Sequence, residues 1–227
     1  GPGTGALTKF LLQDKSIDLR VVELDMESVR FLKETFPELK GKILEMDFLE
    51  MDFNSPSLGL NGQKTGIIGN FPYNISSQIL FKVYEERDKI PEVVGMFQKE
   101  VGQRIASMPG SRDYGILSVL LQAFYNIEYL FTVNENVFSP PPKVKSAVIR
   151  MTRNEVKKLN CDENLFKTVV KTAFNQRRKT LRNALRGLLE KKGITIAGEM
   201  EIFKKRAEQL SVYDFITLTK WMEEGCK

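Results

Sequence analysis

Residues 65–74 have the sequence Thr-Gly-Ile-Ile-Gly-Asn-Phe-Pro-Tyr-Asn, in which a short apolar run ends in an amide, a proline and an aromatic ring. The apolar run predicts a buried strand, and the proline predicts a stiff turn directly after it. The side chain of Asn70 offers a carbonyl acceptor, and Pro72 restricts the direction of the Phe71 backbone carbonyl. Two acceptors beside the ring of Tyr73 suit the amino group of a planar base, because its two N–H groups can be accepted while the ring stacks on its face. A surface turn with an exposed tyrosine is the simpler alternative.

Strands and helices alternate on both sides of this stretch. Apolar spacing predicts strands over residues 19–24, 42–46, 92–98, 126–133 and 143–152, and helices over residues 26–36, 76–86, 99–107 and 115–124. Such alternation predicts an α/β fold with a mostly parallel sheet and helices on both of its faces. Ligands of such sheets bind outside the carboxyl ends of the strands. The polar residues at three of these ends, Glu23, Asp47 and Asn70, are therefore expected to converge on one crevice.

The apolar pattern becomes purely helical after about residue 153, which predicts two domains, over residues 1–155 and 156–227. Lysine and arginine balance aspartate and glutamate over residues 1–159, 20 against 20, so the net charge of +5 lies entirely in residues 160–227. A neutral first domain followed by a basic second one indicates a catalytic domain joined to a domain that contacts a polyanion. Residues 211–214 form a predicted capping box that opens a last helix.

The composition excludes several classes of chemistry. The chain has no histidine, which rules out serine–histidine and cysteine–histidine catalysis and histidine-ligated metals. Its two cysteines, Cys161 and Cys226, are too few for a disulfide framework or a cysteine-only zinc site, and they are expected to be reduced thiols of a cytoplasmic protein. No apolar run is long enough to span a membrane, and no secretory signal opens the chain. No metal site is expected.

Three glycines open the chain in the sequence Gly1-Pro-Gly3-Thr-Gly, ahead of a predicted helix. Glycines let the backbone approach a ligand closely, and Glu23, at the end of the next strand, lies where a carboxylate would accept from ribose hydroxyls. The carboxylate of Asp47 is placed to accept from the amino group of an adenine ring. These features suit NAD as well as S-adenosylmethionine, and the segment from Asn70 onward favours the second. The simpler alternatives are a solvated strand-end carboxylate for Glu23 and a turn residue or helix cap for Asp47.

A basic segment lies at residues 174–183, with the sequence Phe-Asn-Gln-Arg-Arg-Lys-Thr-Leu-Arg-Asn. Spacing by four residues predicts that Arg178, Arg182 and Arg186 share one face of a helix, where they would meet phosphates. The candidate nucleic-acid contacts are Arg177, Arg178, Lys179, Arg182 and Arg186. A merely solvated basic face is the alternative.

A loop stiffened by three prolines lies at residues 137–144, Val-Phe-Ser-Pro-Pro-Pro-Lys-Val. A base held between Tyr73 and Phe138 would gain about 1–3 kcal/mol per stacking contact. A hydrophobic anchor for the loop is an equal alternative for Phe138.

Taken together, these motifs resemble those of the KsgA/RsmA family of small-subunit ribosomal RNA adenine dimethyltransferases, in family order and nearly from end to end. The motifs are Gly-Pro-Gly-Thr-Gly (1–5), Val-Glu-Leu-Asp (22–25), Gly-Asn-Phe-Pro-Tyr-Asn-Ile-Ser (69–76), Gln-Lys-Glu-Val (98–101), Tyr-Gly-x-Leu-Ser-Val (114–119), Phe-Ser-Pro-Pro-Pro-Lys-Val (138–144) and Ala-Phe-Asn-Gln-Arg-Arg-Lys-Thr (173–180). The last two favour this branch over related antibiotic-resistance enzymes that methylate large-subunit rRNA. The family more often has leucine at the position of Phe71, from which only a backbone carbonyl is required.

The resemblance implies a Rossmann-like methyltransferase domain followed by a small all-helical domain. It implies that the protein uses S-adenosyl-L-methionine to dimethylate N6 of two adjacent adenosines in a hairpin near the 3′ end of small-subunit rRNA, during biogenesis of the small ribosomal subunit. The implied cofactor ligands are Gly1, Gly3, Glu23, Asp47 and Asn70. The implied residues around the target base are Asn70, Phe71, Pro72, Tyr73 and Phe138.

The family has a motif and a first strand ahead of its glycines, so we expect the natural protein to have residues upstream of Gly1. Two other functions stay open. One is a non-catalytic RNA-binding assembly factor of the ribosome that keeps the fold. The other is an NAD-binding oxidoreductase, which is disfavoured because no candidate proton donor accompanies the glycines. A monomer is expected.

Overall fold

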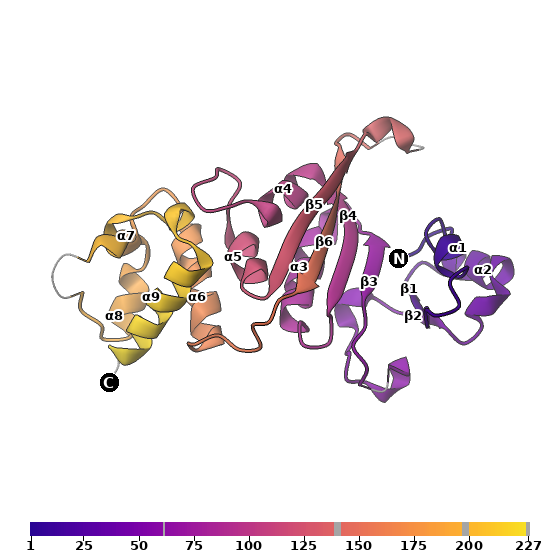
Figure 1. Ribbon diagram of the computed structural model, residues 1–227, viewed down its shortest axis with the longest axis horizontal. Helices are drawn as coiled ribbons and strands as arrows, with labels where there is room; N and C mark the ends of the chain where they lie inside the picture. Colours follow the sequence, from indigo (N-terminus) through magenta and orange to yellow (C-terminus); the bar gives the residue numbers. More distant parts are fainter. Residues whose placement is uncertain (61, 139–141, 197–199, 226–227) are drawn as a thin grey trace. The chain divides into compact units, whose positions relative to one another are not determined.

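The structure, a computed structural model, describes residues 1–60, 62–138, 142–196 and 200–225. The chain forms two compact units (Figure 1). The first comprises residues 1–98 and 130–150, and the second comprises residues 99–129 and 151–227. The domain boundary expected near residue 155 stays a prediction.

The strands form two sheets (Figure 1). The first pairs β1 (Val21–Glu23) with β2 (Ile43–Glu45) in parallel. The second has the order β3-β4-β6-β5, from β3 (Ile67–Asn70), β4 (Glu92–Gln98), β5 (Tyr125–Val133) and β6 (Ser146–Arg153). β3 and β4 are parallel, with Gly69 opposite Gly95 and Asn70 opposite Met96. The expected α/β fold with parallel strand pairs is confirmed, and both Glu23 and Asn70 end their strands as expected.

The helices of the first unit differ in how much apolar surface they bury, and Phe10, on the first of them, is 61% exposed. They are α1 (Thr8–Leu11), α2 (Met26–Thr35) and α3 (Ser76–Glu85). The Asp25 side chain accepts a hydrogen bond from Ser28 N at 2.8 Å and so begins α2. Hydrogen bonding to the side chain and backbone of Ser28 lowers the pKa of the Asp25 carboxyl. On α3, the buried side chains are Ser76, Ile79, Leu80, Val83 and Tyr84, which share one face.

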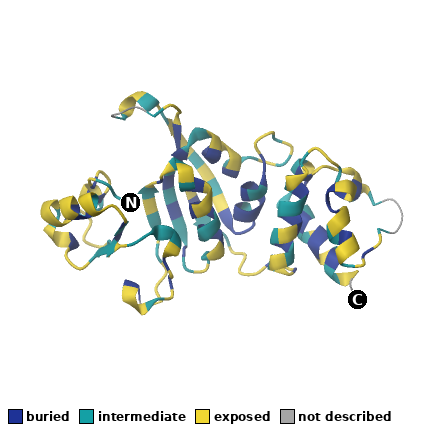
Figure 2. Cartoon of the chain, turned by 180° about the vertical axis from the view of Figure 1, so that it is seen from behind, coloured by how far each residue is buried: buried dark blue, intermediate teal, exposed yellow. Residues whose placement is uncertain are grey.

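The second unit is helical apart from its strand ends. Its helices are α4 (Lys99–Ala106), α5 (Ile116–Gln122), α6 (Glu163–Asn175), α7 (Leu181–Ala184), α8 (Arg186–Lys191) and α9 (Val212–Glu224). The predicted capping box at Ser211 and Asp214 is confirmed, since Ser211 Oγ accepts from Asp214 N at 3.1 Å and Asp214 Oδ2 accepts from Ser211 N at 2.8 Å. The rings of Phe174 and Phe215 stack at 5.9 Å between α6 and α9. Figure 2 shows the buried faces of these helices in dark blue and their exposed faces in yellow.

The single helical stripe expected for Arg178, Arg182 and Arg186 is wrong. The helix α6 ends at Asn175, Arg182 lies in α7, and Arg186 begins α8. The break has a tertiary cause, because Leu181 N donates to Lys205 O at 2.8 Å and residues 180 and 206 form an isolated antiparallel bridge. Backbone groups that pair outside the helix cannot continue the helical hydrogen bonds.

Short 3-10 helices complete the chain. They span Pro37–Leu39, Phe48–Glu50, Pro56–Leu58, Tyr73–Ile75, Glu135–Val137, Glu201–Lys204 and Ala207–Gln209. Across the described residues, no helix is both long enough and apolar enough to cross a membrane.

Candidate functional site

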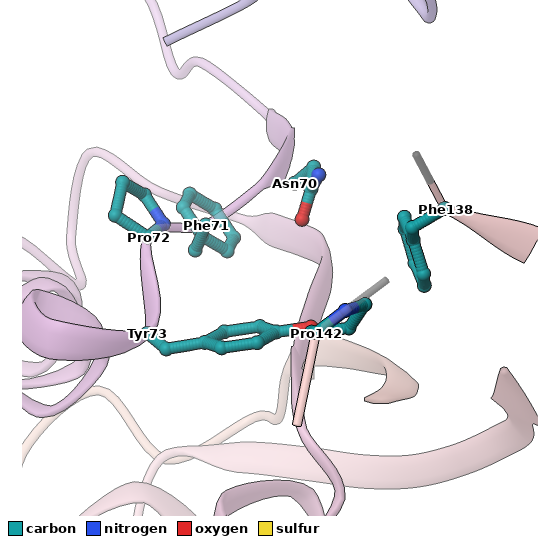
Figure 3. Close-up of a pocket in the computed structure, with 6 residues that line it drawn as sticks. All are labelled: Asn70, Phe71, Pro72, Tyr73, Phe138 and Pro142. Atoms are coloured by element: carbon teal, nitrogen blue, oxygen red, sulfur yellow. The ribbon is translucent and has the colours of Figure 1, made fainter. Parts of the chain in front are cut away.

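A pocket of about 350 Å³ opens where β3 ends. Two segments far apart in the sequence line it, and Figure 3 shows their side chains. The lining residues are Asn70, Phe71, Pro72, Tyr73, Phe138 and Pro142. The first four follow β3, and the last two come from the connection between β5 and β6. The structure therefore brings all five residues predicted around the target base to one pocket.

Two acceptors at this pocket are available to a ligand. Asn70 is exposed, and its amide makes no hydrogen bond with any described residue. The Phe71 carbonyl likewise accepts from no group in the described part of the chain, whereas Phe71 N donates to Met96 O at 3.1 Å. Figure 3 shows Asn70 on one side of the plane of the Tyr73 ring. The Asn70 amide therefore lies beside an aromatic face, and the next residue along the chain has a carbonyl that accepts from no described group.

The side chain of Phe71 anchors this arrangement. Its ring is 8% exposed and stacks on Phe97 of β4, with centroids 5.0 Å apart and planes at 27°. A side chain at Gly95 would overlap this ring, since its Cβ would come within 2.7 Å of Phe71 Cδ2. The sequence indicated only the backbone role of Phe71, and no pattern marked Gly95 as the residue that makes room for the ring.

The Tyr73 hydroxyl is fixed at the far end of its ring. It lies 2.5 Å from Oγ of Ser146, the fully buried first residue of β6. Sequence reasoning missed Ser146. The available signal was a serine beside the buried apolar residues of a strand, where an unpaired hydroxyl would be costly.

Phe138 lies at the edge of the described residues, because Ser139, Pro140 and Pro141 fall outside them. It follows the 3-10 helix Glu135–Val137 and is partly exposed. Phe138 and Tyr73 line the same pocket (Figure 3). Their role in clamping a base stays a prediction.

The glycine loop lies against the Glu23 carboxylate. Gly3 N donates to Glu23 Oε2 at 3.2 Å, while Glu23 Oε1 accepts from the backbone N–H groups of Leu24 and Asp25 at 2.9 and 3.0 Å. Glu23 is 9% exposed, and a Cβ on Gly1 would come within 2.6 Å of its Cδ. A side chain at position 1 would therefore displace the Glu23 carboxylate from its present place against the glycine loop.

Asp47 has a structural contact of its own. Its Oδ1 accepts from Leu49 N at 2.8 Å and begins the 3-10 helix Phe48–Glu50. Neither Glu23 nor Asp47 is among the residues that line the pocket at Asn70. Their convergence with Asn70 around one ligand stays a prediction.

The candidate RNA contacts differ in how they are held. The Arg177 guanidinium donates to Glu208 Oε2 at 2.7 Å and to the carbonyls of Ser111 and Arg112 at 3.3 and 2.5 Å. Arg186 pairs with Glu190 at 2.8 Å on an exposed surface. The remaining three side chains, Arg178, Lys179 and Arg182, are exposed. Among the described residues, no group of three His, Cys, Asp or Glu side chains is arranged to hold a metal ion.

Comparison with known proteins gives one consistent family. The family described as "Ribosomal RNA adenine dimethylase" matches residues 1–224. A relative from Parabacteroides distasonis, named "Ribosomal RNA small subunit methyltransferase A", is 60% identical over 219 residues, which cover 96% of this chain and 80% of the relative. Relatives of the same name are 57% identical in Porphyromonas gingivalis, over 99% of this chain and 85% of the relative, and 56% identical in Bacteroides thetaiotaomicron, over 100% and 83%.

Two solved structures share the fold. A dimethyladenosine transferase from Plasmodium falciparum has a TM-score of 0.76 and 21% identity, over 99% of this chain and 88% of that chain. The 23S rRNA methyltransferase ErmE has a TM-score of 0.63 and 22% identity, over 96% and 88%. These likenesses support an α/β Rossmann-like architecture.

Proposed function

The chain belongs to the ribosomal RNA adenine dimethylase family, and from this premise we propose that it is an S-adenosyl-L-methionine-dependent rRNA (adenine-N6,N6)-dimethyltransferase. Its substrate is a pair of adjacent adenosines in a 3′-terminal hairpin of small-subunit rRNA. The observation that carries the proposal is one pocket lined by Asn70, Phe71 and Tyr73, in which the Asn70 amide lies beside the Tyr73 ring and the Phe71 carbonyl accepts from no described group.

These acceptors would make the N6 nitrogen of the target adenine a better nucleophile. The N6 lone pair of adenine is delocalised into its ring, so the nitrogen attacks poorly when it is planar. Hydrogen bonds from its two N–H groups to Asn70 Oδ1 and the Phe71 carbonyl would orient the nitrogen and favour its pyramidal form as positive charge develops. Stacking on Tyr73 and Phe138 would hold the base at the pocket, and Pro72 would fix the turn between acceptor and ring.

The glycine loop and Glu23 fit a nucleoside-containing cofactor. A largely buried carboxylate, held by three backbone N–H groups, lies close to the backbone of Gly1, and an acceptor of this type suits ribose hydroxyls. Gly1, Gly3 and Glu23 would hold the ribose and amino-acid end, Asp47 the adenine, and Asn70 would lie where cofactor and target meet. S-adenosyl-L-methionine, when bound, supplies an electrophilic methyl group.

The pocket requires no strong base. The described lining residues are an amide, aromatic rings and prolines, and the chain has no histidine. A nitrogen that has gained a methyl group becomes acidic, so its proton can leave to water. The pocket residues therefore contribute position and hydrogen bonding rather than proton transfer.

The basic second unit would bind the RNA backbone. Exposed Arg178, Lys179 and Arg182, with Arg186, would contact phosphates, which position an RNA without reading its sequence. The partner is the immature small ribosomal subunit, and a cytoplasmic location follows from this partner. In this proposal the enzyme acts as a monomer. The family assignment does not favour the alternative of an assembly factor without activity.

The test is methyl transfer from labelled S-adenosyl-L-methionine to unmethylated small ribosomal subunits by the full product of the gene. Label recovered as N6,N6-dimethyladenosine supports enzyme class and substrate together. Subunit binding without label would instead support the assembly factor.

A further inference from the structure

Ser146 is a polar residue in a buried position. It is the fully buried first residue of β6, and because side chains alternate along a strand it faces the side opposite to the buried Ala147 and Ile149. A buried hydroxyl destabilises a fold unless it is hydrogen-bonded. Within the described residues, the hydrogen-bond partner of the Ser146 side chain is the Tyr73 hydroxyl, at 2.5 Å.

The opposite end of the Tyr73 side chain is also held. Tyr73 begins a 3-10 helix directly after Pro72, whose carbonyl accepts from Ile75 N at 3.3 Å and from Ser76 Oγ at 3.0 Å. The backbone of Tyr73 is therefore fixed by the turn, and its hydroxyl is fixed by Ser146. A tyrosine ring has two rotatable bonds, and tethering both ends leaves its plane little freedom.

The same hydrogen bond joins two segments that are far apart in the sequence. Ser146 lies four residues after Pro142, at the end of the connection that carries Phe138, and Tyr73 lies on the segment after β3. The positions of Tyr73 and Ser146 are 73 residues apart in the chain. Their bond therefore ties the segment that carries Asn70 and Tyr73 to the start of β6.

We propose that Ser146 is a positioning residue, which sets the plane of the Tyr73 ring on which the target adenine would stack. The inference rests on the proposed function and deepens it. A stacking ring contributes fully only when its orientation is fixed before the base arrives, because otherwise binding must also order the ring. Ser146 acts through Tyr73 and touches no substrate.

A double-mutant cycle tests this role. Four proteins are compared: wild type, Ser146→Ala, Tyr73→Phe, and the double variant. Each single variant removes one hydroxyl and retains the ring, so each is expected to lower kcat by about five- to tenfold, with KM for the subunit changed by less than about twofold. The second substitution should then change kcat by less than about twofold, because the hydrogen bond is already absent.

A second readout does not depend on methyl transfer. The target adenosine of an RNA hairpin is replaced by 2-aminopurine, whose fluorescence is quenched when it stacks on an aromatic ring. Wild type should quench the probe, and Ser146→Ala and Tyr73→Phe should lose a similar share of the quenching. Ser118→Ala is the matched control. Ser118 is another fully buried serine, donating to Arg104 O at 2.6 Å and accepting from Gly115 N at 2.9 Å in the second unit.

Loss of stability alone would give a different result. All proteins are assayed well below their melting temperatures, and Ser118→Ala should lower the melting temperature without changing the quenching. The inference is overturned if Ser146→Ala lowers kcat as much in the Tyr73→Phe background as in wild type, or if it leaves kcat and quenching unchanged. If wild type transfers no methyl group, the proposed function fails, and the quenching comparison alone decides the role of Ser146.

Discussion

The ring of Phe71 occupies the space that a side chain at Gly95 would fill. Phe71 directly follows β3, and Gly95 lies on the neighbouring parallel strand β4, where Gly69 and Asn70 pair with Gly95 and Met96. A Cβ on Gly95 would come within 2.7 Å of Phe71 Cδ2 and within 2.8 Å of Phe97 Cε2. Because the same residue supplies the proposed carbonyl acceptor, glycine on one strand sets the position of an acceptor on the next.

Gly95→Ala should therefore damage stability and activity together. Overpacking of a buried ring costs about 1–3 kcal/mol, and displacement of Phe71 would also move its carbonyl. Thermal unfolding and methyl-transfer kinetics measure the two effects. Phe71→Leu in the same protein should recover part of both, since the shorter side chain frees space. Gly187→Ala is the control, because a Cβ on Gly187 meets nothing within 4 Å. Equal effects of the two alanine substitutions would refute the packing argument.

Asn70→Ala should abolish transfer and spare RNA binding. The substitution removes one of two acceptors for the target amine, and the loss of such a hydrogen bond lowers kcat by about 100-fold or more. Asn70 is exposed, so the melting temperature should not change. Rapid-quench transfer and filter binding to the RNA hairpin measure the two quantities. Asn126→Ala, at an exposed amide on β5, serves as control. Activity retained by Asn70→Ala would exclude it from the site.

Glu23→Gln should weaken cofactor binding. The carboxylate accepts from three backbone N–H groups with two oxygens, whereas glutamine offers one oxygen and an amide that donates. We expect about a tenfold or greater increase in the Kd for S-adenosyl-L-methionine, measured by calorimetry. Glu27→Gln, at an exposed carboxylate in the first turn of α2, should not change it. An unchanged Kd for Glu23→Gln would remove Glu23 from the cofactor site.

Arg177 and Arg178 should give different results although they are adjacent. Arg178→Gln should weaken RNA binding and reduce the slope of log K against log salt by about 0.7–0.9 for each phosphate that the protein no longer neutralises. Arg177→Gln should instead lower stability, by about 1.5–3 kcal/mol, because its guanidinium already binds Glu208 and the carbonyls of residues 111 and 112. Salt titrations and thermal unfolding of both variants separate these effects. A smaller salt slope for Arg177→Gln at unchanged stability would show that Arg177 contacts RNA.

The Cys161 thiol should react slowly with alkylating reagents. Burial, followed by the nearby carboxylates of Glu223 and Glu163, raises its pKa from 9.0 to about 11. At pH 8 only roughly one thiol in a thousand would be the reactive thiolate. In the native Cys226→Ser variant, the rate at which iodoacetamide labels Cys161 should rise with pH up to about pH 11. In urea, Cys161 should react at the rate of a free thiol. Because the unfolded thiol ionises first, this group stabilises the fold below pH 9 and its contribution is lost as pH rises toward 11. Rapid labelling of the native protein at pH 8 would contradict the shift.

Local sequence patterns predicted the elements of this chain well. The strand at 92–98, the α2 and α3 helices and the capping box at Ser211 all follow from apolar spacing and cap residues, which act within a few positions. The residues following Asn70 were placed at a pocket for the same reason, since a strand end and a proline turn are local features.

Local patterns could not predict the contacts between residues that are far apart in the sequence. The helix expected through Arg178 is broken because Leu181 pairs with Lys205, and Arg177 is held by Glu208, 31 residues away. The bond from Tyr73 to Ser146 and the space at Gly95 likewise depend on which strands become neighbours. Periodicity describes which residues face inward, and it carries no information on which inward-facing residues meet.

The neutral lining of the pocket has a consequence for how the reaction responds to its surroundings. Among the six residues that line it, the Tyr73 phenol is the one group able to ionise, and its oxygen is shared with Ser146. The other five side chains, an amide, two aromatic rings and two prolines, have no ionisable group. A drift of internal acidity during starvation or rapid growth would therefore leave these five side chains chemically unchanged, including Asn70, the proposed acceptor of the target amine.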